Sequence, residues 1–503
     1  MLERIYSLSS RSRLHDESNA AVLLCTYPLQ RVELNATASA VLRMLDGVTP
    51  LRRLIEPASP AQFTEVVDFL ESLVTQGCVS VRYEITAPVR SPAIEVVVPV
   101  LNNAAGVRRC LAALAMQDYP RGLCRVTVVD DGSQPALDLE GDPTLHEALT
   151  LCRVLRSETN AGPGNARNLA ILNPFPGLTP SELIAFTDSD CVPDPAWLSE
   201  MAGVLEGDGI AAAGGRVLGL DPHTLLGRYE SECASLDLGS KGGPAGGVED
   251  RLPYLPTCNL AVRRAALVAV NGFSPDLRLG EDVDLSWRMN SLGYRLFYYP
   301  GAVVRHGYRD RLLPFMKRKA EYASTEGWLS RKFPFRRTRK ESRLASFVLT
   351  AWAVACVAPW VAAAGLFLVT LAALILEGAL HGWANRKALS PSASSDVLAA
   401  LLRRSGAQVL IRCRSWVRQH AIIGVGVALL GWKFPWIWGW QCAVFLTAAW
   451  GEWEVRRPRL PWLEFIAGYV FDTLAYSSGR WYSRVRDLFP ATRRTRVWVA
   501  RTH

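Results

Sequence analysis

Residues 183–190 read Leu-Ile-Ala-Phe-Thr-Asp-Ser-Asp, a largely apolar run that ends directly in two aspartates. The run from Leu183 to Thr187 is typical of a buried strand. Because side chains alternate along an extended chain, Asp188 and Asp190 project to the same side. One of these carboxylates can hold a ribose, and the other can bind Mg²⁺ or Mn²⁺, which both favour oxygen ligands. An Asp-x-Asp motif is common by chance, so its weight depends on what surrounds it.

Further apolar runs flank this stretch on the N-terminal side. Ile94 to Val100 and Val126 to Val129 are typical of buried parallel strands. The amphipathic stretch from Gly106 to Met116 between them is long enough for a crossover helix. The alternation predicts a doubly wound α/β domain over residues 90–330, in which ligands bind beyond the carboxyl ends of the strands.

Polar signatures follow these strands. Asn103 comes after the first, and Asp130-Asp131-Gly132-Ser133 comes after the second. A carboxylate there can accept hydrogen bonds from a nucleotide base or a ribose, although this tetrapeptide is also ordinary turn composition. The segment Asn160 to Asn168 (NAGPGNARN) lacks the Lys-Ser/Thr pair of a phosphate-binding P-loop, but its Arg167 offers a fork of donors to a diphosphate or a base.

The last signature is Glu281-Asp282, which supplies a proton acceptor. An acceptor hydroxyl that attacks an anomeric carbon must lose its proton, and we predict that Asp282 takes it, with Glu281 beside the acceptor. The same acids suit a helix N-terminus, since Asp284 to Arg288 continues as a helix. His306 is a candidate to complete the metal shell or to touch a phosphate, although a lone histidine is more often structural. Together the signatures indicate transfer of a sugar from a nucleotide donor.

These residues resemble the family 2 glycosyltransferases of GT-A fold over about residues 93–310. The resemblance implies an inverting, metal-dependent reaction with Asp282 as its base. It implies that the nucleotide sugar is bound by Pro99, Val100, Asn103, Asp131, Arg167, Asp188 and Ser189. It places Asn259, Glu281 and Arg288 in the acceptor and sugar pocket, and Asp190 and His306 on a Mg²⁺ or Mn²⁺ ion.

A closer resemblance, to the glycosyltransferases of the mycofactocin system, covers nearly the whole chain. It is carried by Arg228-Tyr229-Glu230, Ser235 to Gly239, Tyr254-Leu255-Pro256, Leu279 to Arg288 and the tail segment Phe471-Asp472-Thr473-Leu474-Ala475-Tyr476. It implies transfer of glucose from UDP-glucose onto a peptide-derived redox cofactor, as one sugar or as an oligosaccharide. Pro256-Thr257-Cys258 and the insert from Lys241 to Val248 depart from this pattern, which leaves the acceptor open.

Residues 1–88 predict a small helical module. An asparagine-capped helix covers 36–46, Thr49-Pro50 opens a short second helix, and a third covers about 61–76 before a strand at 79–83. Three helices followed by a strand resemble the winged-helix-like PqqD domains, which recognise precursor peptides. The alternative is a plain helical prefix that packs on the enzyme.

The amino-acid composition indicates in which compartment the protein works and which partners it binds. In 503 residues, a hydrophobic fraction of 49%, a mean hydropathy of +0.10 and 16 tryptophans are high for a soluble enzyme. The net charge of +9 suits an anionic lipid surface. The basic residues lie beside apolar blocks instead of interleaving with an aromatic platform, so no nucleic acid partner is expected. The 11 cysteines form no C-x-x-C pair, which fits a reduced compartment without a zinc site or a disulfide framework. The first thirty residues show no convincing secretory signal.

Residues 345–503 predict a helical, membrane-associated region. No charged residue occurs from Ala345 to Leu376, and a second apolar block runs from Ala421 to Trp450, interrupted only by Lys433 and Pro435. Arginines border both blocks on both sides, which favours hairpins or interfacial helices on the cytoplasmic face of the cell membrane over single crossings. A buried helical core is the alternative.

Three other functions are compatible with parts of this sequence. A processive polysaccharide synthase carries a Q-x-x-R-W signature, which the corresponding Lys317-Arg318-Lys319-Ala320-Glu321 lacks. A family 2 transferase acting on a lipid-linked or cell-envelope polysaccharide acceptor stays open. A degenerate transferase serving as a peptide-binding membrane protein is the non-enzymatic alternative, and the intact Asp188, Asp190 and Asp282 argue against it.

Overall fold

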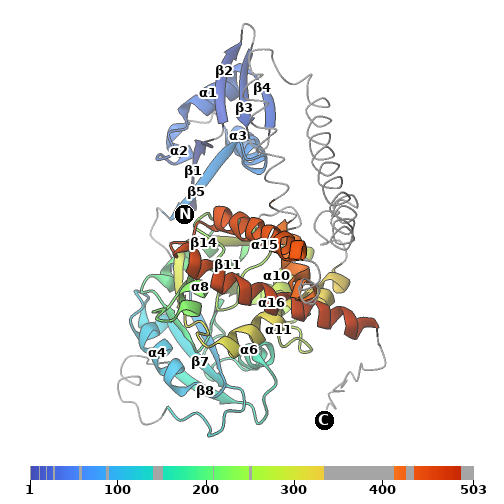
Figure 1. Cartoon of the computed structure of the whole chain (residues 1–503). Coiled ribbons are helices and arrows are strands. Elements are labelled where there is room, and N and C mark those ends of the chain that lie inside the picture. Colours follow the sequence, from blue (N-terminus) through green and yellow to red (C-terminus); the bar gives the residue numbers. More distant parts are fainter. Residues whose placement is uncertain are drawn as a thin grey trace. The chain divides into compact units, whose positions relative to one another are not determined.

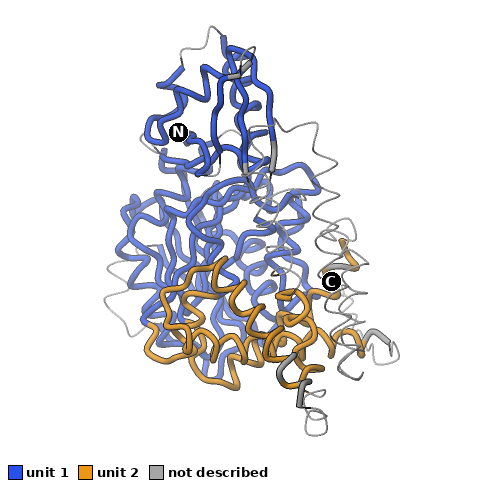
Figure 2. The backbone as a smooth tube through the Cα atoms, turned by 45° about the horizontal axis from the view of Figure 1, so that its top comes forward, with its two compact units in different colours: residues 1–221, 234–307, 351–409 blue, residues 222–233, 308–350, 410–503 orange. Residues whose placement is uncertain are grey.

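The computed structural model describes most of the N-terminal two thirds of the chain and three C-terminal stretches. The described residues are 2–333, except 11, 18–19, 27–28, 56–58, 86–89, 140–150, 208 and 248–251, together with 410, 413–425 and 435–488. They fall into two compact units (Figure 2). Unit 1 holds the described residues of Met1–Asp221 and Ala234–Gly307, and unit 2 holds those of Pro222–Cys233, Tyr308–Thr350 and Leu410–His503. The predicted apolar block at 345–376 lies outside the described residues.

Unit 1 is built on a mixed sheet whose described strands run in the order β10-β14-β11-β13-β9-β6-β7-β8, with β12 beside β14 (Figure 1). Its parallel part comprises β6 (Ile94–Val100), β7 (Cys124–Asp130), β8 (Cys152–Arg156) and β9 (Leu183–Thr187). Every residue of β6, β7 and β9 is buried, as the continuous apolar runs predict.

The rest of the sheet departs from an all-parallel pattern. It comprises β10 (Cys191–Pro193), β11 (Ile210–Gly219), β12 (Gly243–Ala245), β13 (Asn259–Arg263) and β14 (Arg295–His306). Strand β13 lies antiparallel between β9 and β11, while β11 and β14 are parallel to each other. Since β13 reverses direction relative to both neighbours, β11 and β14 run the same way as β6, β7 and β9. The carboxyl ends of all five therefore lie at one edge.

Helices cover both faces of this sheet. They are α4 (Ala104–Ala115), α6 (Pro163–Leu172), α7 (Trp197–Leu205), α9 (Arg264–Ala269) and α10 (Glu281–Ser291), with a short 3-10 turn, η1, at Arg121–Leu123. Alternate residues of β6 enter different cores. Val96 and Val98 pack with Leu111 of α4, whereas Val97 packs with Ala170 of α6. The crossover helix predicted at 106–116 is confirmed, two residues longer at its start.

One carboxylate is buried within this sheet. Glu95 of β6 is 1% exposed and accepts a hydrogen bond from the Thr127 hydroxyl at 2.7 Å. Its two oxygens also pair with Arg153 at 3.1 Å and Arg264 at 2.6 Å. The carboxylate thus links β6 to the strand β8 and to the helix α9.

Replacing Glu95 with alanine is expected to destabilise the protein by about 3–5 kcal/mol, because two guanidinium groups lose their buried partner. Denaturation in urea followed by tryptophan fluorescence measures the loss. The matched control is Glu182→Ala, because Glu182 also pairs with two arginines but its side chain is 42% exposed. That change should cost less than about 1 kcal/mol. Equal losses in the two variants would contradict a structural role for the Glu95 network.

The N-terminal part of unit 1 is a separate small α/β layer. It contains β1 (Leu2–Leu8), β2 (Ser12–Glu17), β3 (Ala20–Thr26), β4 (Leu29–Leu34), α1 (Ala36–Met44), α2 (Leu51–Leu54), α3 (Pro60–Thr75) and β5 (Val79–Ile85). The three helices and the final strand lie where they were predicted, and Asn35 caps α1 through a hydrogen bond from Ala38 N. The strands β1 to β4 were not predicted, because Ser12–Glu17 is mostly polar and charged and shows no apolar alternation. Strands β2, β3 and β4 form an antiparallel meander, and β1 pairs with β5.

Unit 2 is helical. Its elements are α8 (Leu225–Cys233), α11 (Leu312–Lys332), α15 (Pro435–Arg456) and α16 (Trp462–Leu488), with further helical residues at 413–425. They pack around a core that includes Tyr229, Phe315, Phe465 and Tyr469. No described helix combines the length and apolar character needed to cross a membrane. Because α8 comes from the middle of the α/β segment, this unit is assembled from three separate stretches of the chain (Figure 2).

Candidate active site

Most of the predicted site residues lie at or just beyond the carboxyl ends of the parallel strands. Pro99 and Val100 end β6, Asp188 and Ser189 follow β9, and His306 ends β14. Because these strands run the same way, their ends form one edge of the sheet, where ligands bind in open α/β sheets. The sheet thus brings together signatures that lie more than two hundred residues apart.

Asn103 and Ser189 join two of these strand ends. The Asn103 side chain caps α4 by accepting a hydrogen bond from Gly106 N at 3.1 Å. Its amide nitrogen donates to the Ser189 hydroxyl at 3.3 Å. Two residues predicted to bind the nucleotide are therefore in contact, beside the Asp-x-Asp segment.

Asp131 holds the turn that leads into α6. Its two carboxylate oxygens accept hydrogen bonds from the backbone amides of Ala161 and Gly162, both at 2.9 Å. Gly162 has a φ of +96°, a conformation that side chains with a Cβ rarely adopt. Asp131 is only 4% exposed, so it shapes the Asn160–Asn168 segment directly. Its predicted contact with a nucleotide stays a prediction.

Arg167 connects the Asp-x-Asp segment to the predicted base segment. It lies on α6 and is 1% exposed. One terminal nitrogen donates to Asp188 at 2.6 Å and the other to Glu281 at 3.0 Å. Its guanidinium is thus committed to two carboxylates of this chain, a role that the sequence did not reveal, since these residues come from three distant segments. A buried charge paired in this way fixes the positions of both partners.

Asp282 lies in the first turn of α10, which begins after Gly280 in the left-handed conformation at φ +75°. Burial and the neighbouring Glu281 carboxylate raise the pKa of Asp282 to about 7. Val283 N and the Arg167 charge oppose this rise. A carboxylate whose pKa lies near neutrality is well matched to accepting a proton at physiological pH.

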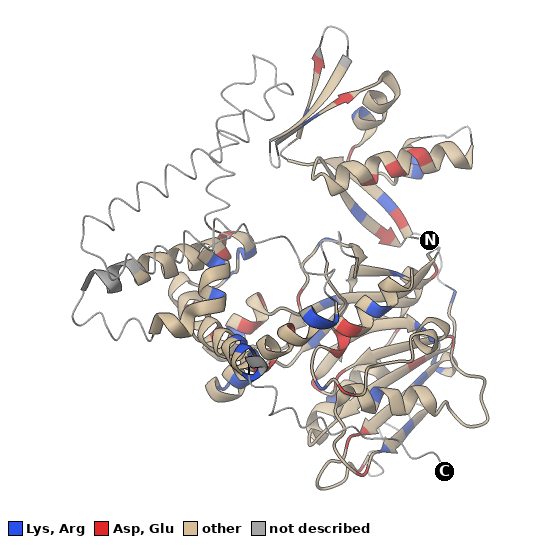
Figure 3. Cartoon of the chain, turned by 90° about the vertical axis from the view of Figure 1, so that its right-hand side faces the viewer, with Lys and Arg blue, Asp and Glu red and all other residues tan. Residues whose placement is uncertain are grey.

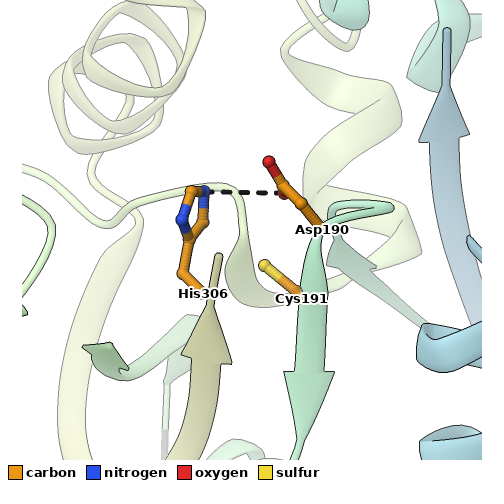
Figure 4. Close-up of side chains that lie close together, drawn as sticks. All are labelled: Asp190, Cys191 and His306. Atoms are coloured by element: carbon orange, nitrogen blue, oxygen red, sulfur yellow. Dashed lines mark ion pairs between the residues drawn. The ribbon is translucent and has the colours of Figure 1, made fainter. Parts of the chain in front are cut away.

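Asp190 and His306 form the part of the site that suits a metal. Asp190 directly precedes β10, and His306 ends the neighbouring antiparallel strand β14, with Cys191 of β10 directly opposite His306. The His306 Nε2 atom lies 3.6 Å from Asp190 Oδ1, and the side chains point toward each other (Figure 4). Ligand atoms of Asp190, Cys191 and His306 all lie within 4.8 Å of one another. Burial, together with the hydrogen bond to Cys258, raises the pKa of the Cys191 thiol well above its usual range.

Two of the predicted pocket residues, Asn259 and Arg288, form hydrogen bonds within the protein. Asn259 is fully buried, accepts a hydrogen bond from Trp197 Nε1 at 2.8 Å, and donates to the carbonyls of Arg216 and Ala302. Its side chain therefore ties β13 into the sheet core, and its predicted contact with the sugar stays a prediction.

Arg288 is likewise committed to the protein. Its guanidinium donates to Asp284 at 2.8 Å and to the carbonyls of Val270 and Gly272 at 2.6 and 2.8 Å. It therefore fixes α10 against the loop before it, and its predicted place in the acceptor pocket stays a prediction.

Models of known protein families match the part of the chain that carries these residues. Residues 95–266 match the model of the glycosyl transferase family 2, and residues 183–448 match that of the glycosyl transferase family group 2. The second match spans more than half of the chain and includes the Asp-x-Asp segment, Asp282 and His306.

Similar proteins extend this comparison. The chain is 29% identical over 456 residues to the pre-mycofactocin glycosyltransferase of Mycobacterium tuberculosis, covering 85% of this chain and 91% of the relative. It is 29% identical over 219 residues to the glycosyltransferase AglE of Haloferax volcanii, covering 43% of this chain and 67% of that protein. Among solved structures, a mannosyltransferase from Pyrobaculum calidifontis in complex with GDP-Man and Mn²⁺ aligns with a TM-score of 0.41 and 21% identity, covering 63% of this chain and 89% of that one.

Proposed function

Because the chain belongs to the family 2 glycosyltransferases, we propose that it transfers glucose from UDP-glucose onto a peptide-derived redox cofactor of the mycofactocin kind. The enzyme class is hexosyltransferase, and the chain is close to the mycofactocin member of the family. The observation that carries the proposal is the similarity to the pre-mycofactocin enzyme over 85% of this chain, together with an intact Asp188, Asp190 and Asp282.

The proposed reaction is a single displacement with inversion. The oxygen of an acceptor hydroxyl attacks the anomeric carbon of glucose while its proton passes to the Asp282 carboxylate. The bond from that carbon to the diphosphate oxygen breaks, and the electron pair leaves with UDP. Arg167 positions the two carboxylates on either side of this event, Asp188 toward the donor and Glu281 toward the acceptor.

Asp190 and His306 would hold a divalent ion in this scheme. Their carboxylate and imidazole atoms lie close enough to share an ion, and a carboxylate ligand suits Mg²⁺ or Mn²⁺. Such an ion supplies Lewis acid stabilisation of the departing diphosphate.

The pH dependence of transfer should follow Asp282. Its pKa of about 7 means that the proton-accepting form is scarce well below neutrality and dominant well above it. We expect kcat/KM to rise with pH and to level off above pH 7, because only the deprotonated carboxylate is a base. Steady-state rates between pH 5.5 and 9, about 1.5 units below and two units above the pKa, test this. A rate independent of pH across that range would contradict the assignment of the base.

The acceptor is tested with product analysis. The full chain is incubated with UDP-glucose, Mn²⁺ and a premycofactocin-type peptide product, and mass spectrometry follows the gain of hexose on the acceptor. Parallel reactions contain a polyprenyl phosphate in place of the peptide-derived acceptor. Glucosylation of the peptide-derived compound supports the proposal, whereas sugar transfer to the lipid phosphate alone supports the alternative of a lipid-linked acceptor. Hydrolysis of the donor with no transfer to either compound rejects both.

The N-terminal layer of residues 1–88 is proposed to recognise the peptide-derived acceptor, as PqqD-like domains recognise precursor peptides. The helix α3 carries Glu65, Asp68 and Glu71 at three-residue spacing, so acidic positions recur along it (Figure 3). Since Glu71 accepts a hydrogen bond from Tyr6, the paired substitution Glu65→Lys and Asp68→Lys is the safer probe. A raised acceptor KM with unchanged donor hydrolysis supports recognition. An unchanged KM would leave the layer a structural role only.

We also propose that the enzyme is held on the cytoplasmic face of the cell membrane through unit 2. Support comes from exposed apolar side chains on α15, among them Trp438 at 53%, Leu446 at 47% and Trp450 at 51%. Helical spacing places these three within about one third of the helix circumference, which suits an interfacial helix. Full-length protein should float with anionic vesicles and resist high salt, and Trp438→Ser with Trp450→Ser should weaken that binding. Protein that stays entirely in the soluble fraction at low salt would reject the assignment.

A further inference from the structure

Unit 2 encloses a polar cavity of about 300 Å³ among the residues that the structure describes. Its walls come from α8, the helical residues 413–425, α15 and α16. They include Arg414, Arg418, Glu452, Arg456, Tyr469 and Asp472. This volume lies at the lower end of the range of small-ligand sites. Basic positions gather on these helices (Figure 3).

The cavity holds more cationic than anionic groups. Arg414 and Arg456 share one carboxylate, that of Glu452, at 2.5 Å each. The other lining carboxylate, Asp472, lies 3.6 Å from Lys319 and accepts a hydrogen bond from the Tyr229 hydroxyl at 3.1 Å. Three lining arginines thus face two lining carboxylates, one of which already has a lysine partner.

Arg418 is the lining arginine that forms no close ion pair, although the charges of Asp472, Glu326 and Glu452 act on it at longer range. No carboxylate of the described residues lies within ion-pair distance of its guanidinium, which stacks over the Tyr476 ring at 4.1 Å from the centroid. The residue nevertheless keeps an exposed surface within a wall of mostly buried side chains. Stacking on an aromatic ring holds a guanidinium flat and leaves its N–H edge free to bind an anion.

Tyr469 supplies a second donor from another helix. The residue is only 4% exposed, yet it lines the cavity, and its hydroxyl makes no hydrogen bond to any described residue. Because the residue lines the cavity and its hydroxyl has no partner among the described residues, the hydroxyl can donate a hydrogen bond to a molecule that occupies the cavity. The two donors thus come from different helical segments, 413–425 and α16.

We propose that this cavity binds a phosphate group, with Arg418 and Tyr469 as its donors. The phosphate belongs either to a lipid headgroup or to a free phosphorylated molecule. The segments Arg228-Tyr229-Glu230 and Phe471–Tyr476, which carry the closer family resemblance, both contribute residues to its wall. The site is formed by unit 2 alone and does not depend on the transfer reaction proposed for unit 1.

Calorimetric titration of the full chain with inorganic phosphate tests the free ligand, and flotation with phosphatidylglycerol-containing or pure phosphatidylcholine vesicles tests the headgroup. Arg418→Gln is expected to weaken phosphate binding about tenfold or more, because a charge-assisted hydrogen bond contributes about 1.5–3 kcal/mol. Arg486→Gln is the matched control, since Arg486 also stacks on a tyrosine of unit 2, Tyr482, but lies outside the cavity. Tyr469→Phe removes one hydroxyl and guards against misfolding of the charge variant. UDP binding shows that unit 1 of each variant is folded.

Saturable phosphate binding that is lost in Arg418→Gln, reduced in Tyr469→Phe and kept in Arg486→Gln supports the site with a free phosphate as ligand. Binding only to phosphatidylglycerol vesicles, with the same dependence on Arg418, supports it with a lipid headgroup as ligand. The proposal is overturned if neither probe binds, or if Arg418→Gln and Arg486→Gln behave alike.

Discussion

Replacing Asp282 with asparagine is expected to lower the rate of sugar transfer by about 10²–10⁴-fold while leaving UDP binding in place. Asparagine keeps the size and the hydrogen bonding of the side chain but cannot accept a proton. Stopped assays of transfer and calorimetry with UDP and Mn²⁺ measure the two properties separately. The control Asp276→Asn changes an exposed aspartate in the loop before α10 and should retain full activity.

Asp190→Ala should differ from Asp282→Asn in donor binding. It removes a predicted metal ligand, so donor binding that depends on Mn²⁺ should disappear together with transfer. If both variants lose UDP binding to the same extent, the division between a base and a metal ligand is wrong.

Substitution of Arg167 by glutamine should have the second largest effect, on stability and on the pH profile together. Asp188 and Glu281 would lose their shared buried partner, at a cost of about 3–5 kcal/mol. The Arg167 charge also lowers the pKa of Asp282, so its removal raises that pKa. The rising limb of kcat/KM should therefore move to higher pH. Denaturation curves and pH–rate profiles measure the two effects.

Arg167→Lys separates charge from geometry. A lysine keeps the positive charge but cannot reach two carboxylates with a planar fork, so the pH profile should stay near that of the native enzyme while kcat falls. A purely structural arginine would lower stability without moving the pH profile in either variant. That result would remove Arg167 from the proposed mechanism.

Local sequence predicted the features that depend on local burial. The strands at Ile94–Val100, Cys124–Asp130 and Leu183–Thr187 are buried on both faces, which leaves largely apolar runs in the sequence. The Asp-x-Asp segment after the third strand and the acids opening α10 were found for the same reason. The first follows the end of a predicted strand, and the second stands at the start of a predicted helix. The strands β1 to β4 were missed; of these, β2 (SRLHDE) is mostly polar and charged, whereas β3 (AAVLLCT) does carry an apolar run.

Roles that depend on distant partners could not be predicted in this way. Asn259 looks like any polar residue beside a strand, and only the packing of Trp197 and two backbone carbonyls shows that its hydrogen bonds are all internal. The sequence predicted that Arg167 binds a diphosphate or a base. Its pairing with Asp188 and Glu281 could not be predicted, because these partners lie 21 and 114 residues away along the chain.

The sequence by itself determined the family, the parallel strands and the acidic groups at their ends. A buried strand requires several apolar residues in succession, and the polar residues that follow it mark its end, so both features can be seen in neighbouring residues. Only the tertiary structure decided which charges neutralise one another. It set Arg167 between Asp188 and Glu281, placed His306 beside Asp190, and left Arg418 facing a cavity without a carboxylate partner among the described residues. Electrostatic pairing depends on distance through space, and that distance is set by the sheet order and the helix packing, which the spacing along the chain does not record.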